Sequence, residues 1–454
     1  MTSRKETIMC MARASAGRGF VYPRYSAAVR KFMNAVGRAY LYVIEGVNSV
    51  SILNQEALID GLEKFYDKNH KLIIAFRHVA KEDAQVMMYA LNRKIHRQIR
   101  KRNRHRDKTD KIIAHAQFIY GIDALNWAGK AAAWLFPRIG CVPVQNGSSN
   151  RNGLNILRNG MREGKFPIAL APEGQVTYHM YTCYPIASGV ASLASWADDD
   201  KDVIILPVAI GYKHTDHPEQ FIRSVVERWE HLSGIKLDTD RSTPILALLH
   251  KVFDITVSLL NEMYELHGET TLTPREQINA ICEKALDLAE QLANVRAEGT
   301  ILDRLFKVRY TGMDAIHPNW FNPFQIAPVK RSLADFDALK AHVYLRHSQV
   351  VDVLEYIHPE YITSPCSAGR ACEFALNLLD VLNRIQGGNI NSRFTPRNKK
   401  AIVSIGNAIH FSQSETRSST KRNRLKAITN EVQSELQAVS TRLETIWETF
   451  VFTE

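Results

Sequence analysis

Three short apolar runs in the first half of the chain predict buried β-strands. They are residues 71–76, 166–171 and 203–210, and each is rich in strand-forming side chains. Continuous apolar runs of this length are typical of strands that are covered on both faces. Helical patterns separate the runs, and strands that alternate with helices indicate an α/β domain. We therefore expect a mixed sheet flanked by helices over residues 46–225.

The residues before the first run have a helical pattern. Over residues 25–67, apolar side chains such as Val29, Met33 and Val36 recur at helical spacing and fall on one face. We expect helical structure throughout this stretch. Residues 1–45 are then a basic N-terminal segment with an amphipathic helix.

Beyond residue 225 the patterns are those of helices. Thr273 and Glu276 have the spacing of a capping box, and Pro274 stands at the first helical position. They predict a helix that runs to about residue 295, and a second helix is expected over residues 371–386. We therefore expect residues 226–454 to form an all-α C-terminal domain.

An apolar stripe near the C-terminus allows two interpretations. Its members recur at spacings of three and four residues, as on one face of a helix. They are Val432, Leu436, Val439, Leu443, Ile446 and Phe450. The stripe either packs within its own domain or forms the seam of a dimer.

The composition is that of an ordinary globular protein. Of the 454 residues, 45% are hydrophobic and 23% are charged, which excludes collagen and wholesale disorder. The six cysteines show no CxxC spacing, so we expect reduced thiols and no zinc site.

The sequence contains no run of 18 apolar residues, so we expect no transmembrane helix. The aromatic-rich residues 112–139 suit either a helix in a membrane interface or a buried helix.

Positive charge is concentrated in two segments of a chain whose net charge is +11. Residues 1–31 hold seven basic side chains and one acidic one, and residues 93–110 hold nine and two. Such segments favour a polyanion as partner. We expect an anionic membrane surface to bind the second segment, whose first cations are Arg93, Lys94, Arg97, Arg100, Lys101 and Arg102. Nucleic acid is disfavoured because no aromatic residues interleave for base stacking. The alternative is a solvated loop.

His78 directly follows the first predicted strand, and Asp83 comes about one helical turn later. Ligands of open α/β sheets bind at the carboxyl ends of strands. A carboxylate at this spacing can fold back to the imidazole, fix its tautomer and support its positive charge, so the pair predicts a general base. The His-x4-Asp spacing alone is a weak signal, because it recurs at His105 and His347 without a preceding strand.

A tight turn closes the second predicted strand. Ala171, Pro172, Glu173 and Gly174 make a strand exit that is expected to expose the carboxylate beside backbone amides. A glutamate there can bind a polyol hydroxyl, and an amide near Gly174 can stabilise an oxyanion. The chain has no Gly-x-Ser-x-Gly elbow for a serine nucleophile and no P-loop for phosphoryl transfer.

Four blocks of the sequence, in this order, resemble the motifs of the glycerolphosphate and lysophosphatidate acyltransferase superfamily. They are Arg77-His78-x4-Asp83, Gly140 to Val144, Ala171 to Gly174, and Leu206 to Ile210. Residues 187–191 also resemble the segment that follows the third motif. The resemblance covers about residues 65–215, under half of the chain.

The resemblance implies a reaction and a set of roles. His78 would deprotonate a glycerol hydroxyl, which attacks the thioester carbonyl of an acyl-CoA or an acyl carrier protein. Asp83 would orient His78, while Glu173 and Gly174 would hold the acceptor. The resemblance implies no covalent acyl-enzyme, no metal and no organic cofactor.

Two motifs depart from the family pattern. The second usually carries an arginine where Asn146 stands, and the third usually continues with threonine and arginine where Gln175 and Val176 stand. An arginine binds phosphate bidentately, and these side chains cannot. The phosphate would then be held by other groups. The candidate substrate-binding cations are Arg77, Arg151 and Lys213.

The sequence therefore predicts a membrane-associated glycerolipid O-acyltransferase of phospholipid biosynthesis, with lysophosphatidate or glycerol 3-phosphate as acceptor. We expect it in the cytoplasm, peripheral on the inner face of the membrane. One alternative is an acyltransferase for another lipid or polyol acceptor. Another is a catalytically weakened module that binds membrane or nucleic acid. Acyl chain length, donor type and oligomeric state stay open.

Overall fold

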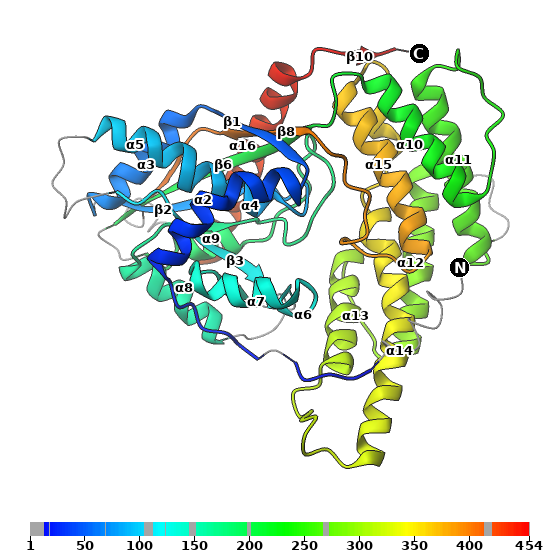
Figure 1. Cartoon of the computed structure of the whole chain (residues 1–454), viewed down its shortest axis with the longest axis horizontal. Helices are drawn as coiled ribbons and strands as arrows, with labels where there is room; N and C mark the ends of the chain where they lie inside the picture. Colours follow the sequence, from blue (N-terminus) through cyan, green and yellow to red (C-terminus); the bar gives the residue numbers. More distant parts are fainter. Residues whose placement is uncertain are drawn as a thin grey trace.

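The computed structural model describes residues 13–17, 19–68, 70–103, 112–122, 124–144, 151–197, 201–266, 272–412 and 420–453. An α/β part built on one mixed sheet lies beside a bundle of helices (Figure 1). The predicted fold class, a mixed sheet flanked by helices and followed by a helical C-terminal portion, is confirmed.

The sheet has eight strands in the order β1-β8-β6-β2-β5-β3-β4, with β9 pairing to β6. The predicted apolar runs form β2, β5 and β6, which lie side by side and parallel at the centre. Their residues are almost all buried, as expected for strands covered on both faces. The strands are β1 (Val47–Leu53), β2 (His70–Phe76), β3 (Gln117–Gly121), β4 (Val142–Val144), β5 (Ile168–Leu170), β6 (Asp202–Lys213), β8 (Lys399–Ile405) and β9 (Ile409–Phe411).

Helices cover both faces of this sheet. A Cβ on Gly61 of α3 would lie 3.1 Å from Leu206 of β6, whereas a Cβ on Gly211 of β6 would lie 2.9 Å from Leu443 of α16. Because alternate residues of a strand point to opposite faces, α3 and α16 lie on opposite faces. The helices of this part are α2 (Ala27–Val43), α3 (Gln55–Tyr66), α4 (Asp83–Tyr89), α5 (His96–Arg102), α6 (Ala124–Trp127), α7 (Gly129–Arg138), α8 (Arg151–Glu163), α9 (Gly189–Ala194) and α16 (Lys421–Trp447). A π-helical turn, η1 (Ala90–Ile95), joins α4 to α5.

Two sequence expectations are wrong in detail. Residues 25–67 are not continuously helical, because residues 47–53 form β1, which pairs in parallel with β8 from the far end of the chain. Residues 112–139 are not one helix either, since they contain β3 before α6 and α7. In both cases a strand is stabilised by a partner that is distant in sequence, so the local pattern did not reveal it.

The second part of the molecule is helical. The capping box at Thr273 is confirmed: its hydroxyl accepts from the Glu276 backbone at 3.3 Å, and the Glu276 carboxylate accepts from the Thr273 backbone at 2.8 Å. The helices are α10 (Pro218–Ser233), α11 (Ile245–Met263), α12 (Pro274–Ala293), α13 (Ile301–Ile316), α14 (Pro328–Leu354) and α15 (Ala368–Ile385). A 3-10 turn at Pro359–Ile362 and a small sheet of β7 (Cys366–Ser367) and β10 (Val451–Phe452) complete it.

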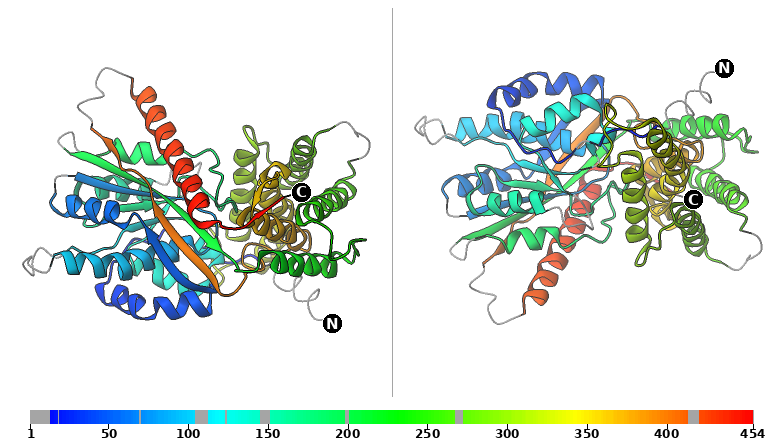
Figure 2. Two further views of the ribbon diagram at one scale, coloured as in Figure 1. Left: turned by 90° about the horizontal axis from the view of Figure 1, so that it is seen from above. Right: turned by 90° about the horizontal axis from the view of Figure 1, so that it is seen from below.

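The chain returns to the sheet after α15. The expectation that residues 226–454 are helical throughout does not hold at β8 and β9, which pair antiparallel with β6. Figure 2 shows α16, in red, lying along the same sheet. The domain division at residue 225 itself stays a prediction.

The C-terminal apolar stripe packs inside the chain. Val432, Leu436, Val439 and Leu443 are fully buried, whereas Ile446 is 64% exposed. The first four contribute to the two hydrophobic clusters of the sheet. The stripe therefore has a partner within its own chain, which disfavours the dimer seam. No helix in the described ranges is long and apolar enough to cross a bilayer.

Candidate active site

The candidate base lies where β2 ends, and its partner is the first residue of α4. His78 Nδ1 lies 3.1 Å from Asp83 Oδ2. The same carboxylate oxygen accepts backbone N–H groups from Val79 at 2.6 Å and Ala80 at 2.8 Å. The Tyr212 hydroxyl donates to Asp83 Oδ1 at 2.6 Å. Four donors thus hold the carboxylate, and the carboxylate in turn holds the imidazole.

Burial decides the electrostatics of this pair. Asp83 is fully buried, and burial raises the pKa of its carboxyl, while the hydrogen bonds from His78, Ala80 and Tyr212 oppose that rise. Burial also raises the pKa of Tyr212 well above its usual value, so its hydroxyl stays protonated and donates. The His78 side chain is 25% exposed. Because Nδ1 faces Asp83, Nε2 is the ring nitrogen that is left for a substrate.

Glu173 supports the same strand end from the third motif. Its Oε2 accepts the His78 backbone N–H at 2.7 Å, and its Oε1 accepts from Arg77 Nε at 2.7 Å. The Glu173 side chain is only 1% exposed, so the carboxylate does not face solvent as the turn suggested. The chain then turns at Gly174, whose φ of +78° favours glycine. Four residues after Glu173, the Thr177 N–H donates to the His78 carbonyl at 2.8 Å. In this structure Glu173 positions His78, and its predicted role in holding the acceptor stays a prediction.

Arg77 does not face a substrate either. Its side chain is fully buried, and all five guanidinium donors have protein partners. Those partners are Glu173 Oε1, the carbonyl oxygens of His179, Met180 and Thr182, and Ser440 Oγ. The prediction that Arg77 binds the phosphate therefore disagrees with this geometry, because no N–H remains for a ligand.

Helices α15 and α16 hold the segment that follows the third motif. Glu373 of α15 accepts the Met180 N–H at 2.9 Å, and Gln437 of α16 accepts the Cys183 N–H at 2.8 Å. Gln437 also donates to the Tyr181 carbonyl at 3.0 Å. These side chains recognise backbone groups. The sequence offered no signal for them, because glutamine and glutamate on a helix are ordinary surface residues.

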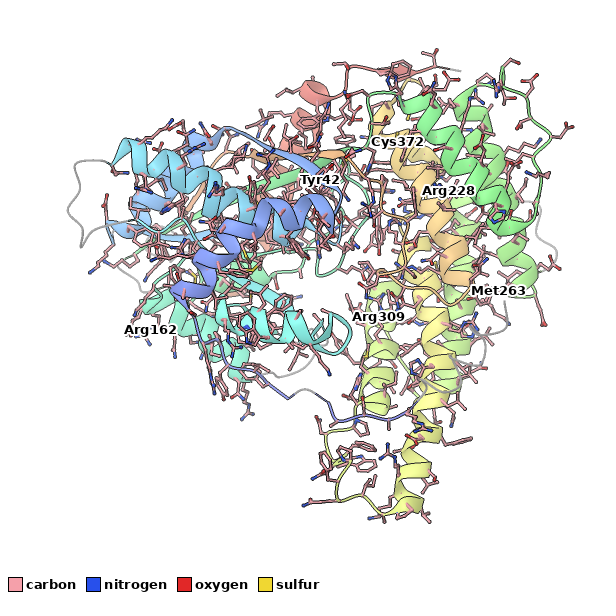
Figure 3. The ribbon with its side chains drawn as sticks, in the orientation of Figure 1. Tyr42, Arg162, Arg228, Met263, Arg309 and Cys372 are labelled. Carbon is pink, nitrogen blue, oxygen red and sulfur yellow. The ribbon has the colours of Figure 1, made fainter. Side chains whose placement is uncertain are left out.

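Gln175, where the third motif departs from the family pattern, contacts the helical part of the molecule. Gln175 donates to the Tyr356 hydroxyl, and Arg309 of α13 donates to Gln175 Oε1 at 3.3 Å. Arg309 also pairs with Asp352 at 2.6 Å, and its side chain is 21% exposed. Figure 3 labels Arg309 on α13, where the helical part faces the α/β part. A cation that the sequence analysis missed thus stands beside the position where the family usually continues with threonine.

The other predicted cations are not assembled around His78. Arg151 is exposed at the first position of α8, and Lys213 at the end of β6 pairs with Asp216 at 3.3 Å. Within the described ranges, neither forms a hydrogen bond or ion pair with His78, Asp83 or Glu173. Asn146 lies outside these ranges.

The predicted membrane-binding cations lie on η1 and α5. Arg93, Lys94, Arg97, Arg100, Lys101 and Arg102 are all exposed. Arg102 pairs with Asp60 at 2.7 Å and with Glu56 at 3.4 Å, so part of its charge is offset. The remaining cations of the run, Arg104, Arg106 and Lys108, lie outside the described residues. Membrane binding by this face stays a prediction.

The repeated His-x4-Asp spacing does not give a second site. His347 bonds to Tyr264 at 3.2 Å, while Asp352 pairs with Arg309 and Arg384. His105 and Asp110 lie outside the described residues. Only at His78 does the described structure join the two members of the pattern, because a strand end and a helix start place them together.

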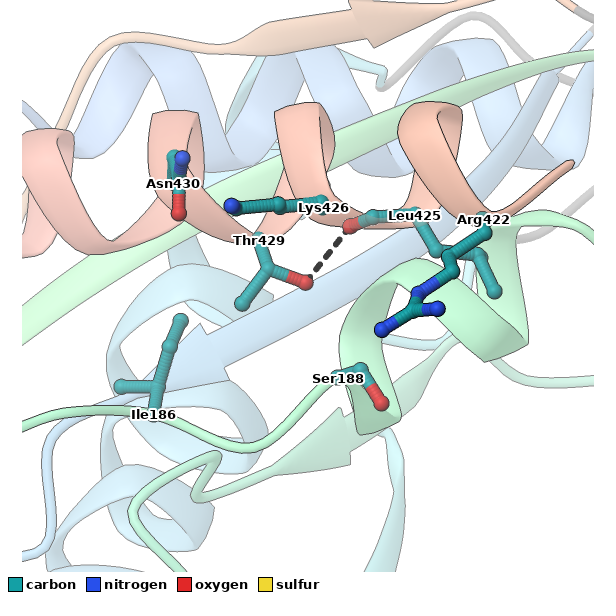
Figure 4. A pocket seen from close by; sticks show the side chains of 7 residues that line it. All are labelled: Ile186, Ser188, Arg422, Leu425, Lys426, Thr429 and Asn430. Carbon is teal, nitrogen blue, oxygen red and sulfur yellow. Dashed lines mark hydrogen bonds between the residues drawn. The ribbon is translucent and has the colours of Figure 1, made fainter. Parts of the chain in front are cut away.

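An open groove of about 660 Å³ lies between α16 and the start of α9. Figure 4 shows its lining side chains, among them Arg422 and Lys426 above Ser188. His78, Asp83 and Glu173 do not line it. The pocket beside the Asp83 loop, which includes Glu82 and Tyr212, is only about 60 Å³ and cannot hold a lipid. No group of three His, Cys, Asp or Glu side chains in the described ranges suits a metal ion.

Comparison with known proteins assigns the α/β part. Residues 56–211 match the model of the family described as Acyltransferase. The match spans the strand end with His78, the start of α4 with Asp83 and the turn with Glu173. A comparison with curated proteins gave no significant match. The superfamily that the four motif blocks predicted is thereby confirmed, and the chain carries a domain of the glycerolipid acyltransferase family over residues 56–211.

Proposed function

We propose that this protein is a glycerolipid O-acyltransferase that moves a fatty acyl group from an acyl thioester to lysophosphatidate or glycerol 3-phosphate. The donor is an acyl-CoA or an acyl carrier protein. The observation that carries the proposal is the His78–Asp83 pair, held at 3.1 Å at a strand end inside the matched acyltransferase domain. The basic face of α5 supports a peripheral position on the inner face of the membrane.

The geometry supports a direct transfer. His78 Nε2 accepts the proton of the acceptor hydroxyl while the hydroxyl oxygen attacks the thioester carbonyl. Asp83 accepts the Nδ1–H and stabilises the imidazolium that forms. The tetrahedral intermediate then expels the thiolate, which takes the proton from His78. The products are an ester and a free thiol, and no acyl group is attached to the protein.

A second candidate is an acyltransferase for another lipid or polyol acceptor. Gln175 is engaged by Tyr356 and Arg309, so this position supplies no free phosphate ligand. The buried Arg77 supplies none either. Arg309 is a partly exposed cation that contacts Gln175. Binding of the acceptor's phosphate by Arg309 would favour the first candidate over a neutral acceptor. A weakened binding module is the third, and the intact His78–Asp83 pair counts against it.

The test is acyl transfer from labelled long-chain acyl-CoA, with acyl-carrier-protein thioester as the second donor. The acceptors are lysophosphatidate, glycerol 3-phosphate and neutral polyols. We expect His78→Ala to lower kcat by roughly 10²- to 10⁴-fold, as for loss of a general base. Asp83→Asn should lower it less, because the base remains but its tautomer is no longer fixed.

His347→Gln is the matched control, because it removes a histidine of the same spacing that has no strand before it. Its activity should equal that of the unaltered protein. Preference for a neutral polyol would select the second candidate. Absence of turnover with every donor and acceptor, from folded protein, would leave only the binding module.

A further inference from the structure

A helical hairpin projects from the helical part of the molecule. It consists of the end of α13, the connecting residues 317–327 and the first half of α14, and Figure 1 shows it as the lowest projection. Large apolar side chains on it are exposed, by 40% to 95% of their surface. They are Trp320, Phe324, Val329, Leu333, Phe336, Leu339 and Val343.

The first half of α14 has two apolar faces. One face, with Ala334, Ala338 and Ala341, is buried in a cluster beneath the hairpin. The other carries Val329, Leu333, Phe336 and Val343 at helical spacing, and all four are at least 48% exposed. A surface helix normally has a single apolar stripe, which faces the core. A contiguous exposed stripe of this kind marks an interaction surface.

The tip of the hairpin is apolar and positively charged. Residues 318–333 contain two basic side chains and no acidic one. Lys330 is exposed, and the guanidinium of Arg331 lies 5.9 Å from the centre of the Phe321 ring. The first acid beyond the tip, Asp335, accepts the Ala14 N–H at 2.9 Å and so serves the N-terminal segment. Exposed aromatic residues beside lysine and arginine are the pattern of a membrane-interface anchor.

We propose that this hairpin docks the protein on an anionic lipid bilayer, with Trp320 and Phe324 entering the headgroup region and Lys330 among the lipid phosphates. The proposal rests on the proposed function only for the expectation that the substrates are lipids. A bilayer is favoured over a second copy of the chain for two reasons. The most exposed side chain, Phe324 at 95%, lies at the loop and not on the α14 stripe. The tip also lacks acidic residues, so it offers no opposite charge to its own counterpart.

The experiment measures co-sedimentation of the full chain with vesicles of phosphatidylcholine, with and without phosphatidylglycerol. We expect binding that requires phosphatidylglycerol and weakens with salt. Phe324→Ser combined with Leu333→Ser should lower vesicle partitioning at least tenfold. Ile446→Ser is the matched control, because Ile446 is an equally exposed aliphatic residue on α16, and it should leave partitioning unchanged. Light scattering of each variant reports the oligomeric state.

Each outcome decides the proposal. Unchanged partitioning in the double variant overturns it, as does equal binding to neutral vesicles. A dimer of the unaltered chain that becomes a monomer in the double variant also overturns it, in favour of a second copy as occupant. Turnover of lysophosphatidate and of soluble glycerol 3-phosphate, measured with acyl-CoA and with acyl-carrier-protein thioester, reports separately on the proposed function. If that turnover is absent in all proteins while the double variant alone loses vesicle binding, the docking surface stands and the proposed function fails.

Discussion

At the scale of single residues, burial decides which charged groups near His78 are free to meet a substrate. Arg77 and Glu173 both adjoin His78, yet each is buried and fully engaged. Removing one partner of a buried ion pair costs about 3–5 kcal/mol, because it leaves an uncompensated charge in the interior. These two residues therefore hold the strand end and the third-motif turn together. From the sequence alone they were indistinguishable from ligands of the acceptor, because residue type does not report burial.

Glu373 gives a prediction at the same scale. Burial raises the pKa of its carboxyl to about 8, although the Tyr361 hydroxyl, the Met180 N–H and nearby Arg370 oppose that rise. The folded protein therefore keeps a proton that the unfolded chain loses near pH 4.5. The stability that this proton contributes is present at low pH and is lost as the pH rises toward 8, by as much as about 1.4 kcal/mol per unit.

Glu373→Gln mimics the protonated acid and should flatten this pH dependence. The measurement is the free energy of unfolding by urea at several pH values between 5 and 8. Glu262→Gln, on the exposed side of α11, is the control and should keep the slope of the unaltered protein. An equal slope in Glu373→Gln would show that Glu373 is already ionised in the folded state.

At the scale of elements, α16 is part of the α/β layer although it comes last in the chain. Its buried stripe packs on the sheet, and Gly211 of β6 leaves room for Leu443. A Cβ at position 211 would lie 2.9 Å from Leu443 Cδ2 and 3.4 Å from Ile402. The absence of a side chain at Gly211 thus sets how closely the helix approaches the strand.

Gly211→Ala should destabilise the protein by about 1–3 kcal/mol, as overpacking of a core does. Leu443→Ala should also destabilise it, by about 2–5 kcal/mol, through a cavity. In the double variant the new methyl group occupies part of that cavity, so its loss of stability should be smaller than the sum. Urea unfolding of the four proteins checks this. Additive losses would mean that the two residues do not share the contact.

At the scale of the whole molecule, the two parts are interlocked. Strand β6 pairs with β8 and β9, and the backbone of residues 178–186 is held by side chains of α15 and α16. The third-motif segment therefore depends on groups from the C-terminal part of the chain. Side chains of α15, in the helical part, hydrogen-bond to the backbone of the third-motif segment and so stabilise its conformation.

Residues 46–225 alone should consequently fail to fold as a soluble monomer. The fragment lacks β8, β9 and α16, so one face of the sheet and one side of β6 would be exposed. Size-exclusion chromatography and circular dichroism of the purified fragment test this, and co-expression with residues 226–454 should restore solubility. A monomeric fragment with cooperative unfolding would establish residues 46–225 as an independent domain.

The sequence by itself determined the features that depend on neighbours in the chain. The central strands, the capping box at Thr273, the His78–Asp83 pair and the turn at Gly174 all lie within a few residues of the signals that predicted them. The tertiary structure decided the rest: β1 exists because β8 pairs with it, Arg77 is buried because α16 covers it, and Gln175 is held by Arg309. Each of these joins residues more than a hundred positions apart. Local patterns carry no information about such partners. The free energy gained from burial and from strand pairing arises only when these distant segments are in contact in the folded protein.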